Sequence, residues 1–188
     1  MTSTGRHRRD SAILAALLAF CLTLAGCAAL LGPEPPDSLK QAATDADWAT
    51  KQIADLPKWT PGSVTAAWFF RPGAERVRVD SGKGDALANY ANAILKGSQV
   101  FNPDRRPGPF AASWHAEVKA AAYMRKNVLS YAVLVINNTG GVCGEGQPEG
   151  CTTAAPIVLP EGYRLVVWWP DQQGSAQGPN HLDGTSDR

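Results

Sequence analysis

The sequence predicts an α/β domain in which a mixed β-sheet has helices packed on its faces. Two observations lead to this fold class. Segments with apolar residues at helical spacing alternate with short runs of β-forming residues, and a predicted hairpin is followed by helix, strand, short helix and strand. With 188 residues, of which 44% are hydrophobic, the chain can bury one ordinary core and has no room for two full domains.

The first predicted elements are a helix and a hairpin. Ser38 can cap a helix over residues 38–56, where apolar positions recur at three- and four-residue steps. Residues 64–70 and 75–80 are rich in β-forming residues. The turn between them, residues 71–74, carries a proline followed by a glycine, which is the order that a turn prefers.

A second helix and a loop follow the hairpin. Asp85 can cap a helix over residues 85–95, and Gly97 closes it. Residues 100–110 contain three prolines and two adjacent arginines, so we expect an irregular loop there. Loops of this kind often carry functional residues.

The third helix leads into the most apolar predicted strand. Ser113 can cap a helix that ends at about Asn127. Residues 129–136 are almost wholly apolar, as expected for a strand that is covered on both faces. The glycine-rich segment 137–150 separates this strand from the next element.

The last predicted elements are short. Residues 152–155 form a helix or turn, and residues 163–169 form a final strand that Pro170 ends. Beyond Asp171 the chain consists largely of Gln, Gly, Ser, Asn and Asp, so the sequence predicts a disordered tail over residues 171–188.

Residues 1–26 have the pattern of a secretory signal peptide. Three arginines lie among the first nine residues, residues 12–24 are apolar, and small residues precede Cys27. The four residues that end at Cys27, Leu-Ala-Gly-Cys, resemble a bacterial lipoprotein lipobox, which implies that Cys27 is lipidated. Residues 27–37, which are proline-rich, would then form a stalk between the lipid and the domain.

An uncleaved transmembrane anchor is the alternative interpretation of this leader. Residues 12–31 have about the twenty residues that a bilayer requires. Both interpretations attach the domain to the cell membrane on the side facing away from the cytoplasm, and a secreted form would share that compartment.

The charge balance excludes a broad nucleic-acid-binding surface. The formal net charge is +1, and the leader holds three of the 18 basic residues and one of the 17 acidic residues. The chain from Cys27 onward therefore carries a net charge of −1. Any binding of nucleic acid must be local.

Four residues between positions 115 and 151 indicate metal chemistry. His115 and Glu117 are two apart at the start of the third predicted helix, and Cys143 and Cys151 follow the apolar strand. Zinc deaminases that act on nucleobases hold Zn²⁺ with one histidine and two thiolates, and a glutamate two residues after the histidine moves protons. His115 and Glu117 can face one metal only from the first turn of a helix, because residues two apart otherwise point to different sides.

The same residues resemble the DddA-like deaminase toxins, bacterial enzymes that convert cytosine to uracil in DNA. The resemblance lies in residues 113–127, 133–138, 143–151, 159–162 and 166–170, and it extends over about residues 60–170. It implies a cytidine-deaminase-like fold, a five-stranded mixed sheet with helices on both faces, over a deaminase-like domain at residues 38–170.

The resemblance also implies roles for single residues. His115, Cys143 and Cys151 would be the zinc ligands, and Glu117 would be the catalytic proton shuttle. Ser81, Asn89 and Tyr90 lie in further matching segments, and we expect them to contact the substrate. The implied partner is DNA, single- or double-stranded, with an immunity protein if the chain is a toxin.

The sequence departs from the family pattern at two places. The usual Cys-x-x-Cys is replaced by Cys143, seven residues and Cys151, and the glycines and proline of segment 144–150 would have to bulge outward. The second departure is the lipobox at Cys27, because such toxins are commonly carried at the end of long secreted polypeptides.

Two other functions fit the sequence. The first is a deaminase that acts on RNA or on free nucleosides. The second is a catalytically inactive surface lipoprotein that serves as a binding module and carries a Cys143–Cys151 disulfide, because paired cysteines in exported proteins often form disulfides. Zinc content separates these two functions.

Overall fold

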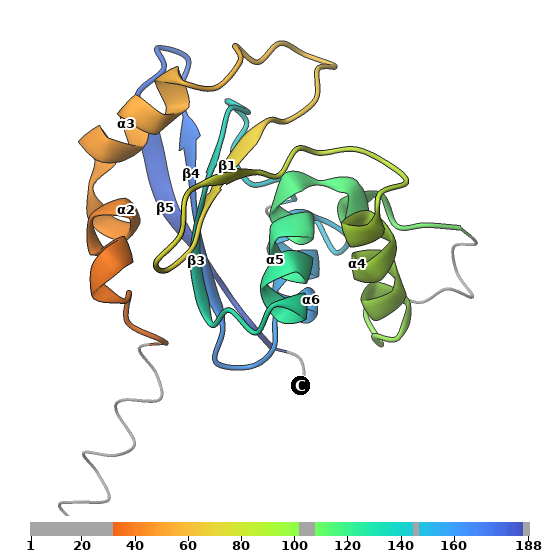
Figure 1. Cartoon of the computed structure of the whole chain (residues 1–188). Coiled ribbons are helices and arrows are strands. Elements are labelled where there is room, and N and C mark those ends of the chain that lie inside the picture. Colours follow the sequence, from red (N-terminus) through yellow and green to blue (C-terminus); the bar gives the residue numbers. More distant parts are fainter. Residues whose placement is uncertain (1–31, 102–107, 145–146, 186–188) are drawn as a thin grey trace, which may run out of the picture. The chain divides into compact units, whose positions relative to one another are not determined.

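Five β-strands form one mixed sheet in the computed structural model, which describes residues 32–101, 108–144 and 147–185. The strands are β1 (Ala67–Phe70), β2 (Val77–Arg78), β3 (Tyr131–Ile136), β4 (Arg164–Pro170) and β5 (Ala176–Asp183). They lie in the order β2-β1-β3-β4-β5 (Figure 1). Strands β3 and β4 are parallel, and all other neighbours are antiparallel.

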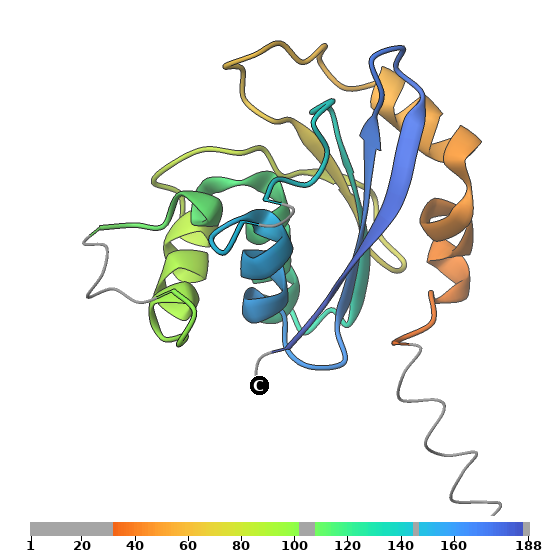
Figure 2. The same cartoon turned by 180° about the vertical axis from the view of Figure 1, so that it is seen from behind.

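Helices cover both faces of this sheet. The α-helices are α2 (Lys40–Thr44), α3 (Ala46–Ala54), α4 (Ala86–Lys96), α5 (Ala116–Lys126) and α6 (Cys151–Val158), with short 3₁₀ turns at Asp37–Leu39 and Ala111–Trp114. Helices α2 and α3 lie on one face, and α4, α5 and α6 lie on the other (Figures 1 and 2). The predicted α/β fold, with a five-stranded mixed sheet and helices on both faces, is confirmed.

Strand β3 separates the two layers of the core. All six of its residues are buried. Val133 and Val135 pack with residues of α2 and α3, whereas Leu134 and Ile136 pack with residues of α5 and α6. Burial on both faces explains why the sequence of β3 is continuously apolar rather than alternating.

The first predicted helix is broken at Asp45. The sequence predicts one helix over residues 38–56, but α2 ends at Thr44 and α3 starts at Ala46. The Asp45 carboxylate accepts a hydrogen bond of 3.0 Å from the backbone N–H of Trp48, which is an N-cap interaction. The cap favours an extended backbone at Asp45, and the helix restarts in a new direction.

The prediction of a disordered tail is wrong for the described part of residues 171–188. Residues 176–183 form the edge strand β5, antiparallel to β4, and Leu182 is buried in the core. The Arg164 guanidinium donates hydrogen bonds of 2.6 and 2.9 Å to the Asp183 carboxylate. The strand contains Gly178 and Pro179, which a strand tolerates at a sheet edge. The domain therefore extends beyond Pro170.

Several predictions concern residues outside the described ranges. The signal peptide, the alternative anchor at residues 12–31 and Cys27 all lie there, as do residues 102–107 of the predicted loop. The chain divides into two units, residues 1–34 and 35–188, and all the elements above belong to the second unit. In the described ranges, no helix has both the length and the apolar character needed to cross a bilayer.

Candidate active site

His115 occupies the N-cap position of α5. Its backbone is extended, with φ −77° and ψ 147°, and the 3₁₀ turn Ala111–Trp114 directly precedes it. Ser113 is not the cap that the sequence predicts, because its hydroxyl donates to the carbonyl of Phe110 at 2.7 Å. His115 and Glu117 are nevertheless placed at the first turn of a helix, as the sequence predicts. Both lie at the start of α5, where their side chains can reach a common point beyond the helix end.

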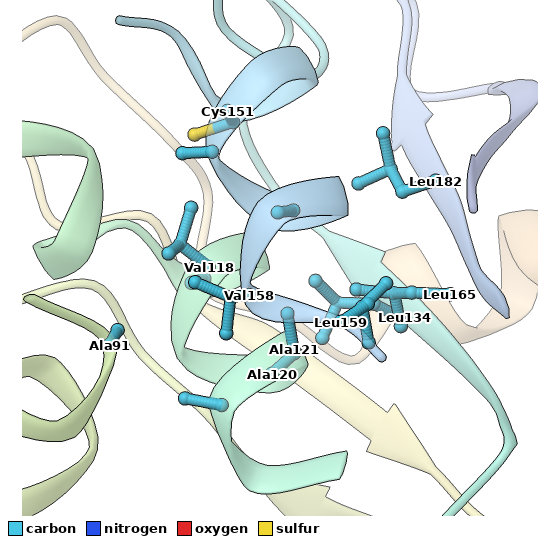
Figure 3. Packing of buried hydrophobic residues seen from close by; sticks show 14 of the residues in the cluster. Ala91, Val118, Ala120, Ala121, Leu134, Cys151, Val158, Leu159, Leu165 and Leu182 are labelled. Carbon is cyan, nitrogen blue, oxygen red and sulfur yellow. The ribbon is translucent and has the colours of Figure 1, made fainter. Parts of the chain in front are cut away.

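The two cysteines are brought together by a pinched loop. Cys143 follows β3, and Cys151 is the first residue of α6, beside the buried cluster that contains Val118 and Val158 (Figure 3). The backbones of Gly144 and Gly150 touch, and a Cβ added to Gly150 would lie 2.3 Å from the Cα of Gly144.

This contact closes the two ends of the inserted segment, of which residues 145–146 lie outside the described ranges. Gly144 has φ +92°, a left-handed conformation that other residues rarely adopt. The Thr152 hydroxyl donates to the carbonyl of Gly144 at 2.9 Å and ties the start of the loop to α6. The long spacing between Cys143 and Cys151 is therefore compatible with adjacent sulfurs.

His115, Cys143 and Cys151 form one cluster of ligand atoms. The Nδ1 atom of His115 lies 3.0 Å from each sulfur, and the two sulfurs are 2.9 Å apart. Both cysteines are free. A zinc ion at 2.0–2.3 Å from its ligands reaches all three atoms, and an imidazole with two thiolates is a donor set that zinc prefers. The residues therefore fit a zinc ion with three protein ligands.

The electrostatics of the cluster favour a thiolate. A hydrogen bond from the Cys151 thiol lowers the pKa of Cys143 to about 4, and His115 lowers it further. The hydrogen bond to Cys143 raises the pKa of His115. The hydrogen bond between Cys151 and Cys143, together with the burial of Cys151, raises the pKa of Cys151 well above its ordinary value. The cluster thus holds one thiolate readily, and a cation there would favour the second.

Glu117 is a buried carboxyl group beside this cluster. Only 3% of the residue is exposed. Burial raises the pKa of Glu117 to about 7, although the backbone N–H groups of Glu117 and Cys143 favour its carboxylate. A group with a pKa near 7 can both accept and donate a proton at neutral pH. Glu117 therefore has the environment of a general acid–base.

None of the three predicted substrate residues belongs to the His115–Cys143–Cys151 cluster. Ser81 is fixed to Thr65, accepting a hydrogen bond at its hydroxyl and donating one from its backbone N–H, both 2.8 Å long. Asn89 and Tyr90 are exposed on α4, and no hydrogen bond within the described residues joins either side chain to the cluster. Their role in substrate binding stays a prediction.

Lys119 is a buried residue of α5 that the sequence analysis missed. It is 6% exposed, its ammonium forms an ion pair with the Asp85 carboxylate, and it donates to the carbonyl of Asp80. The loop that it anchors lies against the active-site segment, because the backbone N–H of Gly82 donates to the carbonyl of Trp114 at 2.8 Å. Lys119 therefore holds this loop beside His115.

Removing the charge of Asp85 is expected to lower the free energy of unfolding more than removing the charge of Lys119. Asp85→Asn keeps an oxygen that can cap α4 at Ala88 but leaves a buried ammonium without its counter-charge. We expect a loss of up to about 3 kcal/mol, below the range for a fully buried pair because the Asp85 side chain is half exposed. Lys119→Met should cost less, and the double variant should recover part of the loss. Urea unfolding of the three variants measures this, and purely additive losses would contradict the pairing.

The fold and the site together define the class of protein. A histidine and a cysteine at the starts of two helices lie together with a cysteine from the segment after β3, and a buried glutamate follows the histidine by two residues. A histidine, two cysteines and a glutamate in this arrangement are typical of deaminase sites. The model of the SCP1.201-like deaminase family matches residues 37–188, and the chain belongs to this family.

The family match confirms part of the resemblance seen in the sequence. The chain is a deaminase-family protein, and the match includes the edge strand β5, which lies beyond the predicted domain end. The search of curated proteins finds no match to this chain.

Proposed function

We propose that the chain is a zinc-dependent hydrolase that converts cytosine to uracil in nucleic acid, with DNA as its substrate. The observation that supports this most strongly is the placement of Glu117, buried beside a cluster of one imidazole and two thiols. Family membership supports deamination, and the likeness of residues 113–127 to DddA-like enzymes favours cytosine in DNA.

Each residue has a distinct part in this mechanism. His115, Cys143 and Cys151 would hold the metal. When bound, zinc lowers the pKa of water toward 7 and so supplies a hydroxide nucleophile at neutral pH. Glu117 takes the proton of the water, passes it to the ring nitrogen of cytosine, and assists the departure of ammonia. The reaction consumes one water and yields uracil and one ammonia.

A panel of substrates tests the proposal. The chain from Ala28 onward, loaded with zinc, is incubated with single-stranded DNA, double-stranded DNA, RNA and cytidine, and uracil or uridine is measured by mass spectrometry. We expect uracil in DNA. Product only from RNA or cytidine would support the alternative deaminase, and no product from zinc-loaded protein would contradict the proposal. A protein mass two units below the reduced value, without zinc, would indicate the disulfide-bonded binding module.

We also propose that the domain is exported and held on the outer side of a cell membrane by lipid at Cys27. The lipobox that ends at Cys27 supports this location. Wild-type protein should carry diacyl lipid and fractionate with membranes, because one acyl chain anchors only marginally. Cys27→Ala should stay uncleaved or be released. Wild-type mature protein that carries no lipid and differs from Cys27→Ala only by the mass of one sulfur atom would contradict the anchor.

The biological role that we propose is that of an antibacterial toxin. A toxin of this kind requires a partner immunity protein in the cell that makes it. Leaderless protein produced in a bacterial cytoplasm should raise the frequency of C-to-T changes in DNA and should slow growth. Unchanged mutation frequency, with active protein in the cell extract, would contradict a DNA-directed toxin.

A further inference from the structure

A cavity lies at the edge of the sheet where β3 and β4 end. Its volume is about 520 Å³, within the usual range of ligand sites. Three segments bound it, namely the end of α3 with residues 56–61, the start of the loop after β3, and the turn between β4 and β5. In sheets with parallel strands, ligands bind outside the carboxyl ends of those strands. Strands β3 and β4 are the parallel pair of this sheet.

The lining of this hollow, hereafter the Trp59 cavity, combines apolar and aromatic surface with hydrogen-bonding groups. Ile53 and Leu56 are buried on its wall, and Trp59 is half-buried there. Gln172 and Gln173 contribute amide groups. An aromatic side chain provides a surface on which any nucleobase can stack, and amides can hydrogen-bond to base edges.

The two charged residues of the Trp59 cavity are not equivalent. The Asp171 carboxylate accepts hydrogen bonds of 2.9 Å from the backbone N–H groups of Gln173 and Ser175. These hydrogen bonds stabilise the β4–β5 turn. Lys58 is exposed, and it forms no ion pair with any residue that the structure describes. The cavity therefore has one cation free to contact a phosphate.

A continuous stretch of chain connects the Trp59 cavity to the metal-ligand cluster. Thr139 lines the cavity, Gly140–Val142 line a smaller hollow of about 310 Å³ together with Trp169, and Cys143 is the next residue. Four residues span at most about 15 Å, so the wall of the cavity at Thr139 lies within that distance of Cys143. Successive nucleotides of one strand in stacked DNA are about 3.4 Å apart, so a few nucleotides span this distance.

We propose that the Trp59 cavity is a binding site for a nucleobase that neighbours the target cytosine in the same strand. The base stacks on Trp59, and Lys58 contacts the strand's phosphate. This inference rests on the proposed function and deepens it, because a cavity of this kind selects a strand over a free nucleoside. Binding here is local, which agrees with the absence of net positive charge in the chain from Cys27 onward.

Oligonucleotides with single abasic positions test the proposal. The substrates carry one cytosine, with either complete neighbours or abasic sites on its 5′ or its 3′ side, in DNA and in RNA. Trp59→Ala should lower kcat/KM on the complete strand by about 5- to 100-fold, as expected for one lost stack. It should have little effect when the base that occupies the cavity is already absent. Trp59→Phe should retain most of the activity, and Lys58→Ala should weaken binding in a salt-dependent manner.

The controls separate this inference from the proposed function. Lys126→Ala removes an exposed cation at the far end of α5 and should behave as the wild type. Binding of labelled single strands by zinc-loaded protein is measured in parallel by fluorescence anisotropy. If no protein deaminates, a weaker affinity of Trp59→Ala still supports the cavity while the deaminase proposal fails. Equal activity and equal affinity of folded Trp59→Ala and wild-type protein would overturn the inference.

Discussion

Zinc-loaded Glu117→Gln protein is expected to lose deamination by about 10²- to 10⁴-fold while it keeps its fold and its metal. Glutamine has nearly the same shape and can remain buried beside Cys143, but it cannot take a proton from water. The pKa of Glu117, raised to about 7 by burial, matches a group that accepts and returns a proton at neutral pH. Uracil formation, zinc content and thermal unfolding are measured on the same sample.

A matched control removes a carboxylate elsewhere. Glu161 is exposed in the turn before β4, and Glu161→Gln should have no effect on deamination or stability beyond about 0.5 kcal/mol. Equal uracil yields from the wild type and from well-folded, zinc-loaded Glu117→Gln would remove Glu117 from the mechanism.

Gly150→Ala should disrupt the metal-ligand cluster although it replaces none of the three ligand residues. The added methyl group would lie 2.3 Å from the Cα of Gly144 and 3.0 Å from the carbonyl oxygen of Cys143, and these backbone atoms cannot move aside as a side chain can. Cys143 or Cys151 must then shift. We expect zinc binding to fall below one ion per chain and deamination to drop by about 100-fold or more, because displacements near 1 Å have such effects.

The control for this steric effect is Gly97→Ala. Gly97 and Gly150 have almost the same φ, −79° and −80°, but a Cβ at Gly97 would meet its nearest atom at an ordinary 3.4 Å. Gly97→Ala should therefore keep zinc and activity. Full zinc occupancy and full activity in Gly150→Ala would show that the pinched loop does not set the cluster geometry.

The cluster could be predicted from the sequence because its requirements are local. A histidine and a glutamate two apart must share the first turn of a helix to face one metal, and α5 begins there. The glycines and proline between Cys143 and Cys151 predicted a loop that could bring the two sulfurs together, and the contact of Gly144 with Gly150 closes that loop. What the sequence could not specify is which two glycines touch, because that depends on how α6 docks.

The errors arose where long-range contacts override local preference. Residues 176–183 contain few β-forming residues, but pairing with β4 and the Arg164–Asp183 contact make them a strand. Lys119 lies in an alanine-rich helix, and only the fold reveals that it is buried against Asp85. The break at Asp45 had a local signal, since an aspartate within a helical pattern can cap a new helix.

The most direct test of the proposed metal-dependent deamination is a cycle of metal removal and return on one preparation. Uracil formation is measured on the purified protein, after chelation, and after addition of one equivalent of zinc. The account predicts one zinc per chain, loss of activity and of thermal stability on chelation, and recovery of both with zinc. Undiminished deamination by metal-free protein, or no deamination by folded protein that holds one zinc, would contradict it.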